Sequence, residues 1–206
     1  GGQAPEWESL GVRRATWLPD GADRDMDQPA PYDEKFACDV AFIGRAVSPG
    51  NDWSRADFLV RLAEKFNVRV WGQDWQRYAD KLNWDGSAVY GRDFAKVCAS
   101  ARIVLDIKPK MWDASVGVYS SNRLVRQIAC GGFSLSRGTL ENKEMFREGE
   151  HCAWYDSEEE AFAKIDYFLR NDHVRREIAL NGSRLVQEHH MLDNRVHNLL
   201  TSEAYA

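Results

Sequence analysis

Short apolar runs that end in glycine alternate with amphipathic helical segments along most of the chain. The clearest run is Asp39–Gly44, and the segment 53–66 that follows it carries its apolar side chains on one helical face. Strands that alternate with helices form a parallel sheet with helices on both faces. We therefore predict an α/β, Rossmann-like fold.

The remaining elements follow from the same periodicities. We expect a strand at Val12–Leu18 and, after Val68–Trp71, further strands at 88–90, 101–107, 133–135 and 151–155. Helices are expected at 75–82, 94–100, 173–188 and 192–203, and one more from Ser157 through Leu169, where Ser157 and Glu160 form a capping box.

The chain is organised around Tyr119–Leu135, which reads YSSNRLVRQIACGGFSL. The polar residues 120–122 can cap a helix, and a glycine pair, Gly131 and Gly132, can end it. Arg123 stands in the first turn, where a positive charge opposes the helix dipole. A bound anion would remove that cost and use the unpaired N–H groups. We therefore expect this helix start to receive a diphosphate.

Several predicted strands end in glycine at one edge of the sheet. Ligands of doubly wound sheets bind at the carboxyl edge. We expect Gly44, Gly72, Gly91, the loop 108–118 and the helix start at Ser121 to converge there on one crevice.

Composition narrows the class of protein. The 206 residues suit one α/β domain, alone or with extensions. A net charge of -5 argues against a nonspecific nucleic-acid surface, so nucleic acid is expected only as an acceptor. The sequence has no apolar run of ~18 residues, so no membrane span is predicted. The cysteines Cys38, Cys98, Cys130 and Cys152 are scattered in apolar contexts, which predicts buried thiols and a reduced, cytoplasmic protein.

Familiar catalytic motifs are missing. The sequence has no GxxxxGKS/T loop, no GxGxxG after the first strand and no GxSxG elbow. The histidines, including the adjacent His189 and His190, lack metal-ligand spacing, so we expect no metal. Glu158–Glu160 is best explained as the acidic first turn of a helix.

Residues 1–37 are rich in Pro, Asp and Gly and read as an extended segment. We interpret them as a connector to another domain, with a disordered tail as the alternative. The domain proper is expected at 38–206. The chain opens Gly-Gly without Met, which suggests a tag remnant or a piece of a longer protein.

The span from Asp39 to Leu200 resembles the C-terminal, donor-binding domain of GT-B glycosyltransferases. The resemblance is carried in order by DVAFIGRA, VRVWGQDW, VYGRDFAKVCASARIVLDI and SNRLVRQIACGGFSL. It is nearest to the spore-maturation (CgeB-like) branch of the glycosyl transferases group 1 type. The segment GVRRATWLPDGAD also resembles the interdomain connector of such enzymes, which implies an N-terminal acceptor-binding domain that this chain does not contain.

The resemblance implies roles for matched residues. Gly44 and Arg45 would lie under the donor diphosphate. Tyr90 and Gly91 would border the base, unless they are an ordinary strand end.

The helix start would hold the phosphates. Ser121 and Asn122 would offer N–H or hydroxyl donors. Arg123 would neutralise the diphosphate and act in catalysis, because its fork binds phosphate oxygens bidentately and stays charged. The alternative for Arg123 is a surface salt bridge.

One position departs from the pattern. Many relatives carry, three residues after this arginine, a glutamate that holds the ribose hydroxyls, whereas this chain has Arg126. An arginine cannot accept hydrogen bonds from a diol. Arg126 would bind another phosphate, the ribose would be held elsewhere, the donor would differ, or the domain would be nonenzymatic. The aromatic residues Trp71, Trp75, Trp84 and Trp112 could stack on a base or sugar, or pack in the core.

The resemblance implies a hexosyltransferase-like enzyme, retaining and metal-independent, which moves sugar from a nucleotide diphosphate sugar to an unknown acceptor. A UDP-sugar is the expected donor substrate, with no separate cofactor. A chain without the acceptor domain would be one half of the active enzyme. The alternative is a non-catalytic nucleotide-binding or interaction module. A receiver-like fold is disfavoured, because no acidic pair follows the first strand.

Overall fold

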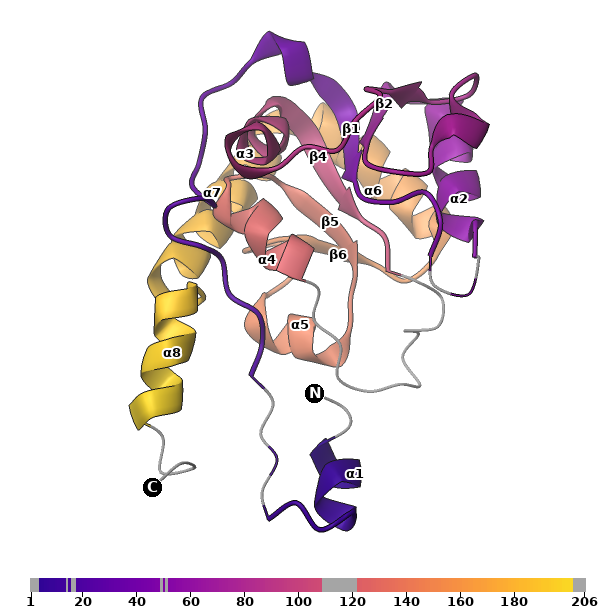
Figure 1. The fold of residues 1–206 in the computed structure, drawn as a ribbon. Helices are drawn as coiled ribbons and strands as arrows, with labels where there is room; N and C mark the ends of the chain where they lie inside the picture. The colour runs from indigo at the N-terminus through magenta and orange to yellow at the C-terminus, as the bar shows by residue number, and fades with distance from the viewer. Residues whose placement is uncertain are drawn as a thin grey trace.

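The computed structural model describes residues 4–13, 15, 18–48, 50, 52–108 and 122–201. Its centre is a six-stranded sheet in the order β3-β2-β1-β4-β5-β6 (Figure 1). All neighbouring strands pair in parallel, as predicted. The strands are β1 (Cys38–Ile43), β2 (Val68–Trp71), β3 (Asn83–Trp84), β4 (Ala101–Asp106), β5 (Ser134–Arg137) and β6 (Ala153–Tyr155).

Helices cover both faces of the sheet (Figure 1). Helices α2 (Ser54–Ala63) and α6 (Glu158–Arg170) share a buried cluster with one face, whereas α3 (Gly91–Ser100) and α4 (Asn122–Ala129) pack on the other. The long α7 (Asp172–His189) lies against α4 and α6. The other elements are α1 (Ala4–Ser9), η1 (Glu34–Phe36), η2 (Gln76–Tyr78), α5 (Leu140–Met145) and α8 (Leu192–Thr201).

The central strand β1 shows why both layers form. Successive side chains of a strand point to opposite faces. Val40 and Phe42 therefore enter the cluster beneath α2 and α6, whereas Ala41 and Ile43 pack beneath α3. These four side chains are almost fully buried.

The register of β1 against β4 brings the ends of these two strands to the same edge of the sheet. Ala41 is paired with Val104, so Ile43 and Asp106, two residues further on, end at the same edge. The chain order reverses between these two strands, because β2 lies on one side of β1 and β4 on the other. This carboxyl edge is the place where ligands of doubly wound sheets bind.

Two strand predictions are wrong. No described residue of Val12–Leu18 is in a strand. Residues 88–90 are not in a strand either. The edge strand is instead the short β3, which lies earlier in the chain. Val89 instead packs against the cluster beneath α3. The predicted helix at 75–82 is reduced to the single turn of η2, and α5, which Thr139 caps, was not expected.

The segment before β1 lies along the helices rather than apart from them. Ala22 is buried, and it donates its N–H to the carbonyl of His190 and accepts from Leu192. The side chain of Ser100, at the end of α3, accepts from the N–H of Asp33. The segment therefore follows one flank of the domain from α8 to the start of β1 (Figure 1).

Two compositional expectations can be compared with the structure. The four cysteines are free and buried, as predicted. None of the helices in the described part of the chain combines the length and apolarity that crossing a bilayer requires.

Candidate functional site

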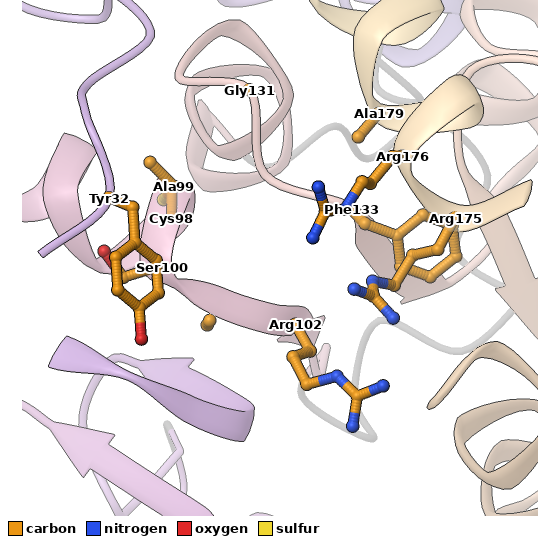
Figure 2. A pocket seen from close by; sticks show the side chains of 11 residues that line it. Tyr32, Cys98, Ala99, Ser100, Arg102, Gly131, Phe133, Arg175, Arg176 and Ala179 are labelled. Atoms are coloured by element: carbon orange, nitrogen blue, oxygen red, sulfur yellow. The ribbon is translucent and has the colours of Figure 1, made fainter. Parts of the chain in front are cut away.

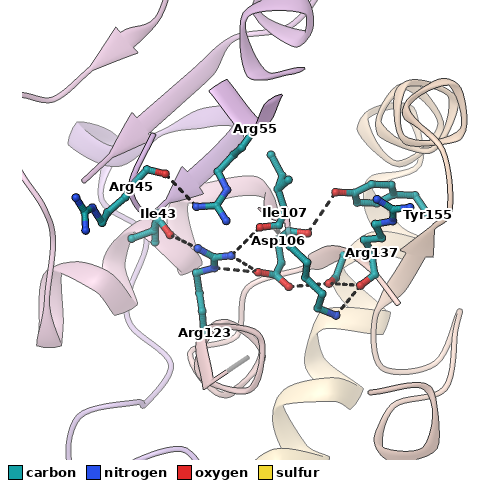
Figure 3. Close-up of polar contacts among 10 residues, drawn as sticks. Ile43, Arg45, Arg55, Asp106, Ile107, Arg123, Arg137 and Tyr155 are labelled. Atoms are coloured by element: carbon teal, nitrogen blue, oxygen red, sulfur yellow. Dashed lines mark hydrogen bonds and ion pairs between the residues drawn. The ribbon is translucent and has the colours of Figure 1, made fainter. Parts of the chain in front are cut away.

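An ion pair between Asp106 and Arg123 lies at the carboxyl edge, between β4 and the start of α4 (Figure 3). Asp106 is fully buried, and its Oδ1 accepts from Nε of Arg123 at 2.9 Å and from Nη2 at 2.6 Å. The guanidinium also donates to the backbone carbonyls of Ile43 and Ile107. Four of its five N–H groups thus have partners among the described residues, and 18% of the side chain stays exposed.

The guanidinium of Arg123 lies directly against the glycine that ends β1. A Cβ placed on Gly44 would be 2.6 Å from Nη1 of Arg123, so any larger residue would displace it. The same guanidinium lies over the ring of Phe42, with its carbon 5.1 Å from the ring centroid. Gly44 and Arg123 therefore meet at the carboxyl edge, as the sequence predicted.

The other groups around Asp106 keep its carboxylate charged. Its Oδ2 accepts from the hydroxyl of Ser136, and Lys108 lies nearby, where its Nζ donates to the carbonyl of Arg137. Burial alone would raise the pKa of Asp106, but the charges of Arg123 and Lys108 outweigh it and lower that pKa. Burial also lowers the pKa of Lys108, although Asp106 partly offsets this.

Tyr155 closes the cluster from the end of β6. Its hydroxyl donates to the carbonyl of Asp106 at 3.3 Å. Burial first, and then the carboxylate of Asp106, raise the pKa of Tyr155. The phenol therefore stays protonated at neutral pH and acts as a donor.

Arg55 is a second buried cation that the sequence reasoning missed. It stands in the first turn of α2, is 7% exposed, and donates from Nη1 to the carbonyl of Arg45 at 3.1 Å. Its guanidinium carbon lies 5.5 Å from the ring centroid of Phe42, the ring that Arg123 also faces. The available signal was its spacing, because Arg55 precedes the buried Phe58 by three residues and so shares the inward face of the helix.

A small pocket of about 70 Å³ opens beside this second cation, between the starts of α2 and α6. Cations from three elements line it: Arg55 from α2, Lys108 after β4 and Arg137 from β5. Asp156 and Glu158 lie on its other side. The carboxyl edge thus offers positive charge on both faces of the sheet.

Two tryptophans fix the glycine tips of the sheet. The indole of Trp75 donates to the carbonyl of Gly44 at 2.9 Å, and that of Trp84 to Gly72 at 3.1 Å. Gly72 has a φ of +143°, and a Cβ there would overlap the carbonyl of Gly44. Trp71 and Trp75 are fully buried. Of the two alternatives left open for these residues, the structure supports packing in the core for Trp71 and Trp75.

The remaining predicted residues are distributed around this edge. Arg45 follows β1, is 62% exposed at its side chain, and pairs with Asp74 at 2.7 Å. Asp74 has a φ of +69°, a left-handed conformation that costs energy in a residue with a Cβ. Asn122 begins α4 and is exposed, whereas Ser121 lies outside the described residues, as do Trp112 and all of the loop 108–118 except Lys108.

Tyr90 and Gly91 lie at the start of α3. Helices that link parallel strands run back along the sheet, so the start of α3 lies at the carboxyl edge as well. Tyr90 is 73% exposed, and Gly91 has a φ of +53°, which favours glycine. Tyr90 and Gly91 therefore lie at the carboxyl edge at the start of α3, whereas Arg123 lies at the start of α4.

Arg126 is engaged by the segment that precedes β1 and by α3. Its Nε donates to both carboxylate oxygens of Asp27, at 2.9 and 3.0 Å, and Asp27 is 1% exposed. Its guanidinium carbon lies 4.7 Å from the ring centroid of Phe94 in α3. Arg126 therefore anchors the segment that precedes β1.

A larger pocket, of about 390 Å³, lies at the opposite, amino edge of the sheet (Figure 2). Arg102, Arg175 and Arg176 point into it from two elements. Arg102 and Arg175 donate to the carbonyls of Leu169 and Phe168, in the last turn of α6. These arginines cap a helix end, which gives them a structural role at this pocket.

Metal coordination has no support in the part of the chain that can be described. Within those residues, no cluster of three or more His, Cys, Asp or Glu side chains is arranged to hold a metal ion.

The chain matches the glycosyl transferase-like family over residues 55–201, and it therefore belongs to that family. Among curated proteins, none matches the chain. The family match begins at Arg55 and contains Asp106, Arg123 and Arg126.

Solved glycosyltransferase structures share the fold. The chain aligns with sucrose-phosphate synthase from Thermosynechococcus elongatus at a TM-score of 0.69 and 14% identity, over 95% of this chain and 55% of that one. With Anabaena HepE, solved with UDP and glucose, the TM-score is 0.72 at 12% identity, over 98% and 61%. The C-terminal domain of a group 1 glycosyl transferase (LpcC) from Francisella tularensis aligns at 0.60 and 15%, over 82% and 97%.

These alignments confirm the predicted fold, a Rossmann-like domain of the GT-B type. The chain spans little more than half the length of the first two proteins, but almost all of the isolated C-terminal domain.

Proposed function

We propose that this domain binds the donor of a glycosyltransferase, a nucleotide diphosphate sugar, at the carboxyl edge of its sheet. The observation that carries the proposal is the pair of guanidinium groups, Arg123 and Arg55, on the ring of Phe42 beside Gly44. Positive charge fixed at this position suits a diphosphate, and the glycine lets the guanidinium of Arg123 approach the end of β1.

The network around Arg123 prepares it for the chemistry. When the bond between the sugar carbon and the diphosphate oxygen breaks, negative charge grows on the leaving phosphate. A cation held beforehand stabilises that charge without reorganising. Asp106 and the carbonyls of Ile43 and Ile107 hold the guanidinium of Arg123, and its exposed fraction faces the donor.

The other residues predicted from the sequence complete the proposed donor site. Arg45, with Gly44, would lie beneath the diphosphate, and Asn122 and Ser121 would donate to it from the start of α4. Tyr90 and Gly91 would border the base at the start of α3. UDP is the proposed nucleotide, because the HepE structure, with the same fold, holds UDP.

The enzyme as a whole is a further proposal. Because the chain spans only 55% and 61% of two similar glycosyltransferases, an N-terminal acceptor-binding domain is proposed to complete the enzyme. Transfer would then be of the hexosyltransferase kind, without a metal, in the spore-maturation branch of the group 1 type.

Calorimetric titration of the chain with UDP, GDP, ADP and inorganic pyrophosphate tests the donor site. We expect at least one nucleoside diphosphate to bind, and Arg123→Met to weaken it more than tenfold, since hydrogen bonds to charged groups contribute about 1.5–3 kcal/mol. Arg170→Met is the matched control, because Arg170 is 74% exposed on α6 and pairs only locally. If no diphosphate binds, or both variants behave alike, the donor site is refuted.

A non-catalytic module on the same fold is the second candidate. Its support is that Arg123 already donates to protein groups with four N–H groups, and that Arg126 is held by Asp27. Hydrolysis of UDP-glucose separates the two candidates. Release of glucose by the chain, abolished in Arg123→Met, favours the enzyme, whereas binding without release, even with an acceptor domain supplied, favours the module.

A further inference from the structure

A tight turn in the segment before β1 presents a methionine to the start of α3. The carboxylate of Asp23 accepts from the backbone N–H groups of Asp25 and Met26. The turn closes when the N–H of Asp27 donates to the carbonyl of Asp23, and the N–H of Asp23 donates back to the Asp27 carboxylate. These bonds fix the direction in which the side chain of Met26 leaves the turn.

The turn is attached to the domain mainly through Asp27. Arg126 binds both oxygens of its buried carboxylate, and Gln187 of α7 donates to its backbone carbonyl at 3.1 Å. The guanidinium of Arg126 also lies over Phe94, in the first turn of α3. The turn is therefore held between α3, α4 and α7.

Met26 lies where the proposed nucleoside would extend from the phosphates. Its Cε is 2.9 Å from the position that a Cβ would take on Gly91. Met26 is 48% exposed, and Tyr90, the residue before Gly91, is 73% exposed. Arg126, which holds the turn, is one helical turn along α4 from Arg123.

We infer that Met26 forms a wall of the nucleoside pocket, beside Gly91, and that the ion pair of Arg126 with Asp27 positions this wall. The inference rests on the proposed donor site. A thioether suits the face of a nucleobase, because it is apolar, polarisable and adaptable. Arg126 is then a positioning residue rather than a phosphate ligand, which accounts for an arginine at a position from which the ribose is not held.

The experiment compares two ligands that share a diphosphate and differ in the nucleoside. Calorimetry gives the dissociation constants of the tightest nucleoside diphosphate among UDP, GDP and ADP, and of inorganic pyrophosphate. We expect Met26→Ala to weaken the nucleotide about five- to tenfold and to leave pyrophosphate unchanged, because the side chain contacts only the nucleoside. Leu18→Ala, at a similarly exposed position of the same segment, is the control and should change neither.

Variants of the ion pair test the positioning role. Arg126→Met and Asp27→Asn should each lower the ratio of nucleotide to pyrophosphate affinity, whereas a loss of stability alone would lower both affinities together. The exchange of the two residues, Arg126→Asp with Asp27→Arg, should restore part of the ratio. Should the folding of these variants fail, Met26→Ala still decides, because Met26 is half exposed.

The outcomes separate the two proposals. If the unchanged chain binds pyrophosphate and nucleotide equally, or if Met26→Ala leaves the ratio as it was, the wall is refuted and the diphosphate site stands. If the unchanged chain binds neither ligand, the donor site and the wall are both refuted.

Discussion

The two edges of the sheet both carry arginines, but they use them differently. At the amino edge, Arg102 and Arg175 border the pocket of Figure 2. Both donate to the last carbonyls of α6, and Arg102 also pairs with Asp39. At the carboxyl edge, Arg123 and Arg55 lie over the ring of Phe42. Figure 3 shows both arginines beside the strand ends. Pocket volume does not separate the two edges, because a pocket of about 480 Å³ beside Gly72 and Tyr90 lies at the carboxyl edge and one of about 390 Å³ lies at the amino edge.

Helix ends explain this difference. The end of α6 brings partial negative charge to the amino edge, and that charge offsets its arginines. The carboxyl edge faces the starts of α2, α3, α4 and α6, which bring partial positive charge to the arginines there. The comparison teaches that arginines alone do not identify an anion site, because the helix ends beside them change the local charge.

The largest expected effect comes from removing the buried acid of the carboxyl edge. Asp106→Asn leaves Arg123 and Lys108 without their shared carboxylate, so we expect the free energy of unfolding to fall by about 3–5 kcal/mol. Urea unfolding measures this change. Binding of pyrophosphate should also weaken, because the guanidinium of Arg123 would lose the group that orients it.

Asp39→Asn is the matched variant at the amino edge. Asp39 is the second residue of β1, whereas Asp106 is the last of β4. The pair of Asp39 with Arg102 is partly exposed, at 3.3 Å. The expected loss is about 0–1 kcal/mol. Equal losses in the two variants would show that the edges do not differ in the way described.

Much of the fold could be predicted because periodicity reports burial. The strands β1, β2 and β4 are mainly apolar, and the structure places them at the centre of the sheet or next to it. The edge strand β3 was missed, because two residues, Asn83 and Trp84, carry no period. It is fixed by the bond from Trp84 to Gly72, which links residues that no local pattern connects.

The candidate site was predictable in part for the same reason. The glycine of β1 and the arginine of α4 could be placed at one edge from topology alone, and they meet there. The roles of Arg55 and of the pair of Arg126 with Asp27 could not be predicted from topology, because each depends on a contact between distant segments. Asp27 and Arg126 are 99 residues apart in the sequence, and only packing brings them together.

Titration gives a second, smaller difference between the edges. Lys108 is buried beside Arg123, and its pKa is lowered from 10.5, the value that applies in the unfolded chain. As the pH rises, the native chain therefore loses this proton at a lower pH than the unfolded chain does. The cost of burying the ammonium is therefore fully present below the native pKa and is relieved as the pH rises towards 10.5. The amino-edge cations are guanidinium groups, which stay charged over this range.

The measurement is the difference in unfolding free energy between the unchanged chain and Lys108→Met, from pH 7 to pH 10.5. We expect the difference to shift in favour of the unchanged chain as the pH rises, with a slope of at most about 1.4 kcal/mol per pH unit, the limit for one proton. The comparison is needed because burial raises the pKa of Cys38 to about 12, so both proteins lose stability at alkaline pH as the unfolded thiol ionises. A difference that stays constant up to pH 10.5 would mean that the amine of Lys108 has its ordinary pKa.

The smallest expected effect separates two exposed arginines, Arg45 at the carboxyl edge and Arg176 at the amino edge. Their side chains are 62% and 78% exposed, and each pairs with one aspartate, so Arg45→Met and Arg176→Met should each change the unfolding free energy by less than about 1 kcal/mol. Binding should nevertheless tell them apart. Arg45→Met should weaken pyrophosphate about two- to fivefold at low salt, because one exposed cation beneath an anion contributes up to about 1 kcal/mol.

Arg176→Met should leave the pyrophosphate affinity unchanged, because its charge lies at the edge where α6 ends. The effect of Arg45→Met should also fade as salt is raised to 1 M, where the Debye length falls to about 3 Å and exposed charges are screened. If Arg176→Met weakened pyrophosphate as much as Arg45→Met, the anion would be drawn by the overall charge of the chain. The carboxyl edge would then not be a specific binding site for the anion.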